Sequence, residues 1–331
     1  MRSPKVSVII PCRNEEKTIQ KLLNALRDQS YPQREMEVVI ADGLSSDGTR
    51  REIKEFQQKH PELEIRVVDN PKRIIPAALN TAIQAARGEI IVRLDAHSVP
   101  KPDYIEGCVH NLEAGKGTNV GGIWLIEAGD DTWVARSIAA AAAHPLGVGD
   151  AKYRYTDTAC EVDTVPFGAY YRTLIDQIAG FDESLLTNED YEFNTRIRRS
   201  GGVLWLDPAI QATYFARSTL GQLAKQYWRY GFWKVKMLRR YPDTIRWRQA
   251  LPPLFTLSLI ALTILSILFP PAGWFLALEV VLYVLVLLLA GAQVSISRKK
   301  SSYLIGVPLA IATMHIAWGS AFLWSIVKGN R

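Results

Sequence analysis

Three long apolar stretches near the end of the chain limit most strongly what it can fold into. They cover residues 251–269, 272–292 and 303–326, and each has about the 20 residues that a helix needs to cross a bilayer. Residues 251–331 contain a single acid, Glu279, whereas the preceding residues carry basic and acidic side chains in nearly equal numbers. The sequence therefore predicts a soluble body followed by a transmembrane region. A soluble domain of hydrophobic helices is the weaker alternative.

Basic residues indicate how these stretches are oriented. The turn at residues 270–271 is uncharged, whereas residues 298–300 are Arg-Lys-Lys. Because Lys and Arg accumulate on the cytosolic side, the second loop and the soluble body are both predicted to lie there. A third crossing would carry Lys328 and Arg331 outside, so a re-entrant or interfacial helix over residues 303–326 remains an alternative.

The net charge of +6 is concentrated just before the first apolar stretch. Residues 217–248 hold nine basic side chains and one acid. Their position favours a membrane surface as the partner, and no nucleic acid is expected. Cys12, Cys108 and Cys160 form no CxxC pair, and the apolar run Val6–Ile10 is too short for a signal peptide, so a cytosolic body is expected.

Short apolar runs alternate with helix-length segments in the first part of the chain. Each strand precedes a helix or a turn rich in polar residues, which predicts βαβ units and a mostly parallel sheet flanked by helices. No GxGxxG follows the first strand, so a dinucleotide site is not expected. The predicted strands are Lys5–Pro11, Met36–Ala41, Ile65–Asp69, Glu89–Leu94, Val120–Ile126, Val162–Gly168 and Val203–Leu206. The predicted helices are 16–29, one from Gly48, 75–87, 132–143, 188–200 and 218–240.

Carboxylates follow two of these strands, where open α/β sheets bind ligands. Asp42, within ADGLSSDGT, can accept hydrogen bonds from a base or a ribose, although a turn with a helix cap explains the same residues nearly as well. Asp95 and His97 occupy alternate positions, so their side chains can face one Mg²⁺ or Mn²⁺ ion. For His97 alone, an ordinary loop histidine is the simpler interpretation.

Two further segments combine charged or aromatic side chains. Glu189 and Asp190 begin a predicted helix, where acids either cap the helix or act as a general base. Arg196, in the same helix, can hold phosphate or pair with these acids. The segment 223–234 (LAKQYWRYGFWK) interleaves aromatic and basic residues, which is typical of a helix at the lipid headgroups.

In this order, the four segments resemble family 2 glycosyltransferases of GT-A fold, in the exopolysaccharide branch typified by succinoglycan glycosyltransferases. The resemblance runs from Val6 to Lys234 and includes the apolar tail. It implies three parts: a GT-A nucleotide-diphospho-sugar transferase domain (1–216), an amphipathic region (217–250) and transmembrane helices (251–331).

The resemblance also implies roles for individual residues. Asp190 matches the catalytic base, with Glu189 beside it, and Asp95 matches the first acid of a DxD metal motif whose second acid is replaced by His97. The remaining matches fall on the nucleotide pocket and on a QxxRW-like motif that holds diphosphate and acceptor. The matches to the nucleotide pocket are Pro11, Asn14, Glu15 and Asp42, and the matches to the QxxRW-like motif are Gln226, Arg229 and Tyr230.

The activity implied is inverting, metal-dependent transfer of one sugar from a UDP- or GDP-sugar to a lipid-linked saccharide or glycolipid. It would take place at the cytosolic membrane face during exopolysaccharide or glycan assembly. Tyr230 stands where processive synthases have Trp, which favours a single addition. The alternatives are a polyprenyl-phosphate sugar synthase, an enzyme acting on a simple lipid, a glycoside hydrolase with two carboxylates, and a scaffold without activity.

Overall fold

The computed structural model describes residues 4–329 and divides them into two compact units. The first unit comprises the described residues up to Leu125 together with Lys152–Tyr214. The second unit comprises Ile126–Ala151 and the described residues from Phe215 onward. Residues 126–151, placed in the catalytic domain from the sequence, thus group with the C-terminal helices, whereas the other boundary lies close to the predicted residue 216.

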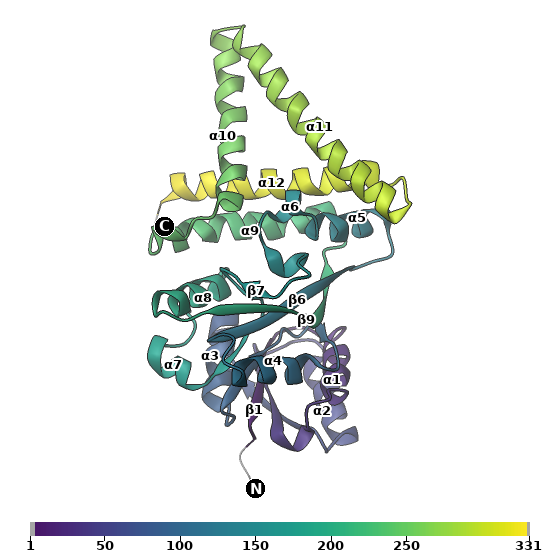
Figure 1. The fold of residues 1–331 in the computed structure, drawn as a ribbon, viewed down its shortest axis with the longest axis vertical. Coiled ribbons are helices and arrows are strands. Elements are labelled where there is room, and N and C mark those ends of the chain that lie inside the picture. Colours follow the sequence, from purple (N-terminus) through teal and green to yellow (C-terminus); the bar gives the residue numbers. More distant parts are fainter. Residues whose placement is uncertain (1–3, 330–331) are drawn as a thin grey trace. The chain divides into compact units, whose positions relative to one another are not determined.

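A mixed sheet forms the centre of the first unit (Figure 1). Its strands follow the order β3-β2-β1-β4-β8-β6-β9-β5, and β7 pairs with β9. The strands are β1 (Val6–Cys12), β2 (Met36–Asp42), β3 (Glu64–Asp69), β4 (Ile90–Arg93), β5 (Ser98–Pro100), β6 (Asn119–Ala128), β7 (Cys160–Glu161), β8 (Ala169–Tyr171) and β9 (Leu204–Ala216). The pairs β1–β2, β2–β3 and β1–β4 are parallel, whereas β8 runs antiparallel to β4.

Helices cover both faces of the parallel strands, because successive side chains point to opposite faces. Val8 and Ile10 pack into one apolar cluster with the helices α1, α2 and α4, whereas Ile9 packs into a second cluster with α3 and α8. This arrangement confirms the predicted fold class for the α/β domain. The helices of this unit are α1 (Ile19–Arg27), α2 (Thr49–Lys59), α3 (Ile75–Ala85), α4 (Tyr104–Glu113), α7 (Thr173–Ile178) and α8 (Glu189–Arg199), with 3₁₀ turns η1 (Gln33–Glu35) and η2 (Lys152–Arg154).

The predicted strand Val162–Gly168 is wrong. These residues form irregular chain between β7 and β8. Pro166 has no N–H to offer a neighbouring strand, and Phe167 and Gly168 have φ values of 61° and 73°, outside the extended region. A Cβ on Gly168 would lie 2.5 Å from Asn119 Oδ1, so the close packing of this bend needs glycine.

The second unit consists of helices, three of which are long and apolar enough to cross a membrane. These three are α10 (Trp247–Leu268), α11 (Ala272–Arg298) and α12 (Tyr303–Lys328); the others are α5 (Trp133–Ala142), α6 (Pro145–Val148), α9 (Leu220–Leu238) and the turn η3 (Pro242–Thr244). The presence of three long apolar helices indicates membrane anchoring. Arg331, which entered the prediction of a third crossing, lies outside the described residues.

Candidate active site

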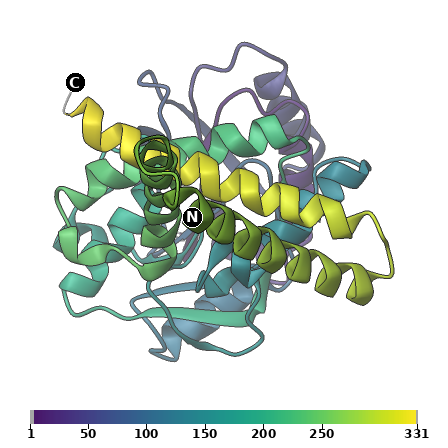
Figure 2. The same cartoon turned by 90° about the horizontal axis from the view of Figure 1, so that it is seen from above.

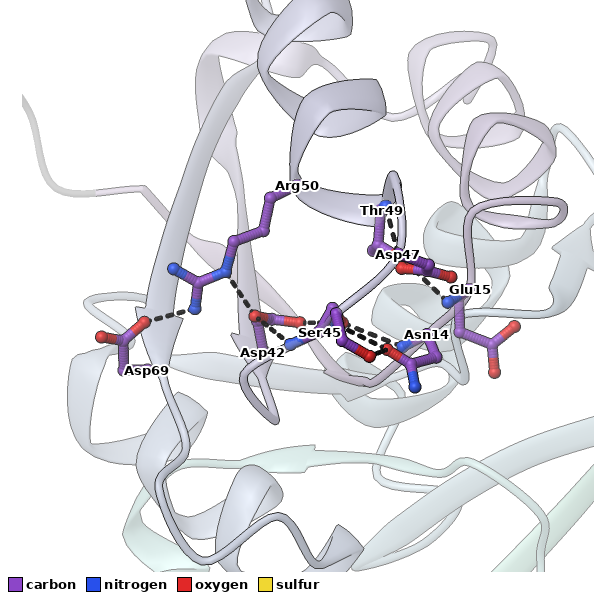
Figure 3. Close-up of polar contacts among 9 residues, drawn as sticks. Asn14, Glu15, Asp42, Ser45, Asp47, Thr49, Arg50 and Asp69 are labelled. Atoms are coloured by element: carbon purple, nitrogen blue, oxygen red, sulfur yellow. Dashed lines mark hydrogen bonds and ion pairs between the residues drawn. The ribbon is translucent and has the colours of Figure 1, made fainter.

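The loops that follow β1 and β2, at the carboxyl end of the parallel strands, are joined by hydrogen bonds. In the parallel pair β1–β2, Cys12 lies opposite Asp42, so the loops that follow these strands start side by side. Ser45 Oγ accepts a hydrogen bond from the Asn14 N–H at 2.9 Å, and Asn14 Oδ1 accepts one from the Ser46 N–H at 2.9 Å (Figure 3). Asn14 has a φ of 56°, which Asn adopts more readily than most residues. The predicted nucleotide-pocket residue Asn14 thus holds the two loops together.

Asp42 is fully buried at the end of β2, and polar groups surround its carboxylate. Ser45 donates to it through its N–H at 3.1 Å and through its hydroxyl, and Arg50 Nε forms an ion pair with it. Arg50 also pairs with Asp69 at the end of β3, as Figure 3 shows. A buried carboxylate with such partners fixes the loop. Because the Asp42 side chain is fully buried and that of Arg50 is 44% exposed, Arg50 is the member of this pair that a ligand can reach.

Glu15 connects the β1 loop to the predicted metal motif. Its N–H donates to Thr49 Oγ1 at 2.8 Å, and its Oε1 lies 3.2 Å from His97 Nδ1. Pro11 lies just before this loop, in β1, opposite Ala41. The structure thus brings Glu15 and His97 together, although they are far apart in the sequence.

A buried arginine joins Asp95 to the helix that carries the predicted base. Arg93 Nη2 lies 3.3 Å from Asp95 Oδ1 and 3.2 Å from Glu189 Oε1. Arg93 is almost completely buried at the end of β4, and burial opposes its charge. The carboxylates of Asp95, Glu189 and Asp190 nevertheless raise its pKa above the ordinary value. Two carboxylates, those of Asp95 and Glu189, therefore contact one buried cation.

Glu189 and Asp190 differ in their surroundings although they are adjacent. Glu189 is buried beside Arg93, whereas Asp190 is half-buried and accepts a hydrogen bond from the N–H of Tyr191 at 2.7 Å. Burial, and then the charge of Asp190, raise the pKa of Glu189 to about 7. Asp190 is therefore the more accessible of the two carboxylates.

We expect the raised pKa of Glu189 to make stability depend on pH. Because the folded state holds this proton up to about pH 7 and the unfolded chain releases it near 4.5, stability should fall as pH rises between these values. The unfolding midpoint of the detergent-solubilised protein, measured in EDTA from pH 5 to 7.5, should therefore fall more steeply than that of Glu189→Gln. Parallel profiles would contradict this prediction.

The donor set of Asp95 and His97 fits a divalent cation that also takes ligands from its substrate. Among residues 4–329, no group of three or more His, Cys, Asp or Glu side chains could hold a metal unaided. The side chains of Asp95 and His97 are 26% and 38% exposed, so both remain accessible to a ligand. One carboxylate and one imidazole suit Mn²⁺, and Mg²⁺ is also commonly held by few protein oxygens with phosphates completing the shell.

Arg196 and the predicted QxxRW-like residues have other partners. Arg196 pairs with Glu192 at 2.8 Å and donates to the carbonyl groups of residues 178–180. Its partner acid is therefore Glu192, one turn further along α8, and not the predicted Glu189 or Asp190. Gln226 Nε2 donates to Tyr230 Oη at 3.0 Å on α9. Gln226, Arg229 and Tyr230 belong to the second unit.

Sequence reasoning missed Arg93 and Arg50. Arg93 ends the otherwise apolar strand Ile90–Arg93, and a charge in a buried strand needs a partner, so the pattern itself carried the signal. Arg50 carries no such signal, because exposed basic residues are common in the first turns of helices.

A comparison with protein families agrees with this geometry. The model of glycosyl transferase family 2 matches residues 7–178, which is more than half of the chain. The chain belongs to glycosyl transferase family 2. It is therefore a glycosyltransferase, and the match includes β2, β4, all of β1 after its first residue, and the positions of Asn14, Asp42 and Asp95.

Relatives of this glycosyltransferase match it over nearly its full length. It is 29% identical to the dolichyl N-acetyl-alpha-D-glucosaminyl phosphate 3-beta-D-2,3-diacetamido-2,3-dideoxy-beta-D-glucuronosyltransferase of Methanococcus voltae, over 98% of both chains. It is also 29% identical to the succinoglycan biosynthesis protein ExoA of Rhizobium meliloti, over 98% of this chain and 96% of the relative. The predicted resemblance to the exopolysaccharide branch is thereby confirmed.

A solved structure shares the fold. The mannosyltransferase PcManGT from Pyrobaculum calidifontis, solved with GDP-Man and Mn²⁺, has a TM-score of 0.67 at 21% identity. The alignment covers 98% of this chain and 88% of that one. It supports the same α/β architecture in this glycosyltransferase.

Proposed function

We propose that this glycosyltransferase moves one sugar, with inversion, from a nucleoside-diphosphate donor to a lipid-linked saccharide or glycolipid at the cytosolic membrane face. The observation that carries the proposal is the Asp95–Arg93–Glu189 contact, which joins the predicted metal motif to the helix of the predicted base. A glycoside hydrolase would not need the polar loops after β1 and β2. The full-length relatives are named for sugar transfer and for succinoglycan biosynthesis.

Asp190 is the proposed general base. Its half-buried carboxylate takes the proton of the acceptor hydroxyl while that oxygen attacks the anomeric carbon. The bond between the anomeric carbon and the diphosphate oxygen breaks on the opposite face, and the nucleoside diphosphate leaves with the bonding electrons. Glu189, buried and paired with Arg93, positions the start of α8 rather than exchanging the proton.

Asp95 and His97 would hold the divalent cation, and the loops around Asn14 and Asp42 would hold the nucleotide. When bound, the cation supplies positive charge that stabilises the departing diphosphate. Arg93 keeps the Asp95 carboxylate in place through its contact with Oδ1. The related mannosyltransferase PcManGT was solved with GDP-Man and Mn²⁺, which supports such a donor and metal.

Removing divalent metal should abolish transfer. We expect EDTA to lower turnover by at least about a hundredfold, because compensating the charge of the leaving group contributes several kcal/mol and about 1.4 kcal/mol is a tenfold change in rate. Added Mg²⁺ or Mn²⁺ should restore the rate, measured as nucleoside diphosphate released. Full activity in EDTA would refute the metal role of Asp95 and His97.

The donor and the acceptor can be identified by two assays. A panel of UDP- and GDP-sugars, screened by thermal stabilisation, should give one donor that raises the unfolding midpoint. Product analysis with that donor then distinguishes the acceptors. A sugar-to-sugar bond supports the proposal, whereas a sugar–phosphate bond or a glycosylated simple lipid would show one of the alternative enzymes.

A further inference from the structure

Helix α12 contacts other helices of the second unit near its start, in its middle and near its end. Near its start, Gly306 packs so closely on α5 that a Cβ would lie 2.1 Å from Ser137 Oγ. In its middle, His315 Nε2 lies 3.0 Å from the carbonyl oxygen of Leu146. Near its end, Ser325 Oγ donates to the carbonyl of Phe232 on α9 at 2.9 Å. At these three places α12 therefore lies against its neighbours α5, α6 and α9.

Helices α10 and α11 form a hairpin with its turn at residues 270–271. The start of α10 and the end of α11, which lie away from this turn, both contact α12. On α11, a Cβ on Gly291 would lie 2.7 Å from the carbonyl oxygen of Leu304. On α10, the carbonyl of Gln249 accepts a hydrogen bond from Trp318 Nε1 at 3.1 Å, and Gly319 packs on Pro252. The early turns of α12 thus meet the end of α11, and its later turns meet the start of α10.

The two views of the structure agree with these contacts. In Figure 1, α12 runs alongside α9, across the lower ends of α10 and α11. In Figure 2, α10 is seen nearly end-on while α12 is seen along its length. A membrane that α10 crosses therefore has α12 lying close to its plane.

Side-chain exposure divides α12 into two faces. Ile305, Leu309, Ile316 and Val327 are exposed, and their spacings of 4, 7 and 11 residues place them on one side of a helix. The residues of the opposite side are buried in one apolar cluster with α5, α9 and α11. They include Val307, Ala310, Ile311 and Met314.

The charges of α9 decide between the two orientations of α12. Lys225, Arg229, Lys234 and Lys236 lie on α9, so a membrane-crossing α12 would bring these cations into the hydrocarbon core, where Lys and Arg are strongly unfavourable. An α12 in the plane of the membrane leaves α9 at the headgroups, where basic and aromatic side chains are stable.

We propose that α12 lies in the membrane plane, within the leaflet that faces α9, with Ile305, Leu309, Ile316 and Val327 on lipid acyl chains. The chain then crosses the bilayer twice, through α10 and α11. Lys328 stays on the same side as the basic residues 298–300, as the preference of Lys and Arg for one side requires. This inference does not depend on the proposed catalytic reaction.

Spin-label depth tests the proposal. Single cysteines replace Ile305, Ile316 or Val327, which are exposed and spaced 11 residues apart. The full chain carries Cys160→Ser so that this partly exposed cysteine is not labelled, whereas Cys12 and Cys108 are buried and stay in place. The chain is reconstituted in phosphatidylcholine–phosphatidylglycerol vesicles, and nitroxide depth is measured from collisions with oxygen and a nickel chelate. We expect nearly equal depths at the three positions. A middle position deeper than both ends by about 16 Å, from the rise of a crossing helix, would overturn the proposal.

Helix α11 provides a control with identical spacing. Trp274, Leu285 and Ile296 are exposed and also lie 11 residues apart, and they should show the crossing profile. An impermeant maleimide gives an independent readout of sidedness. Lys328→Cys, at the exposed end of α12, should react from the same side as Lys59→Cys, on the exposed surface of α2, and from the side opposite to Pro270→Cys. Reaction of Lys328→Cys from the same side as Pro270→Cys would show a third crossing.

Discussion

Asp190→Asn should lower kcat by about 10²–10⁴-fold, because a positioned general base typically contributes that much. Asparagine has nearly the same shape and can still accept the hydrogen bond that Asp190 Oδ1 receives from the N–H of Tyr191. It cannot take a proton from the acceptor. Nucleotide-sugar affinity should change little, since the loops around Asn14 and Asp42 are unaltered. Turnover is measured as nucleoside diphosphate released, and donor affinity by calorimetry.

Asp176→Asn is a matched control for this variant. Asp176 is exposed on α7 and lies with Arg87 and Gly88, which precede β4, around a cavity at the other end of that strand. It should therefore retain the parent kcat. Equal losses of turnover and donor affinity in Asp190→Asn would mean that Asp190 binds the donor instead of accepting a proton.

Much of the first unit could be predicted because its local signals agree with the fold. The apolar runs that became β1, β2 and β4 are short, and each is followed by a turn or a loop, as in parallel sheets covered on both faces. The carboxyl ends of β1 and β2 therefore had to lie side by side, and Asp42 had to lie at that edge.

The errors occur where local and tertiary signals disagree. The segment Val162–Gly168 looks like a strand by composition, yet Pro166 and two positive φ values end the extended conformation. The predicted strand Val203–Leu206 is too short, because β9 runs from Leu204 through Asp207-Pro208 to Ala216, with Asp207 Oδ1 accepting the N–H of Ala209 at 2.9 Å.

Pairing across the fold was the least predictable part of the site. The motif around Asp95 indicated a metal ligand, but nothing near it in sequence shows that Glu189 lies across Arg93 from it. Arg196 is a further example, because its preference for Glu192 and the carbonyl groups of residues 178–180 depends on where α7 ends. Such pairs depend on the distances between helices and strands in the fold, and the spacing of apolar residues in the sequence does not indicate these distances.

Arg93→Met should destabilise the protein strongly, because it leaves two carboxylates around a buried position without a cation. Removing one partner of a buried ion pair typically costs about 3–5 kcal/mol, which for a unit of this size lowers the unfolding midpoint by about 6–20 °C. Methionine keeps much of the volume, so the loss reports charge rather than a cavity. The exposed Arg34, 3.9 Å from Glu35, provides the control Arg34→Met, whose midpoint should barely change.

The double variant Arg93→Met/Glu189→Gln separates this charge effect from general damage to the core. Glu189→Gln alone removes the ion pair with Arg93 and should lower the free energy of unfolding. In Arg93→Met, however, the Glu189 carboxylate has lost this cation, so adding Glu189→Gln should recover part of the lost stability. Turnover should fall in Arg93→Met even at temperatures where it is folded, because Asp95 loses the contact that orients it. Strictly additive losses in the double variant would show that Arg93 and Glu189 are not energetically coupled.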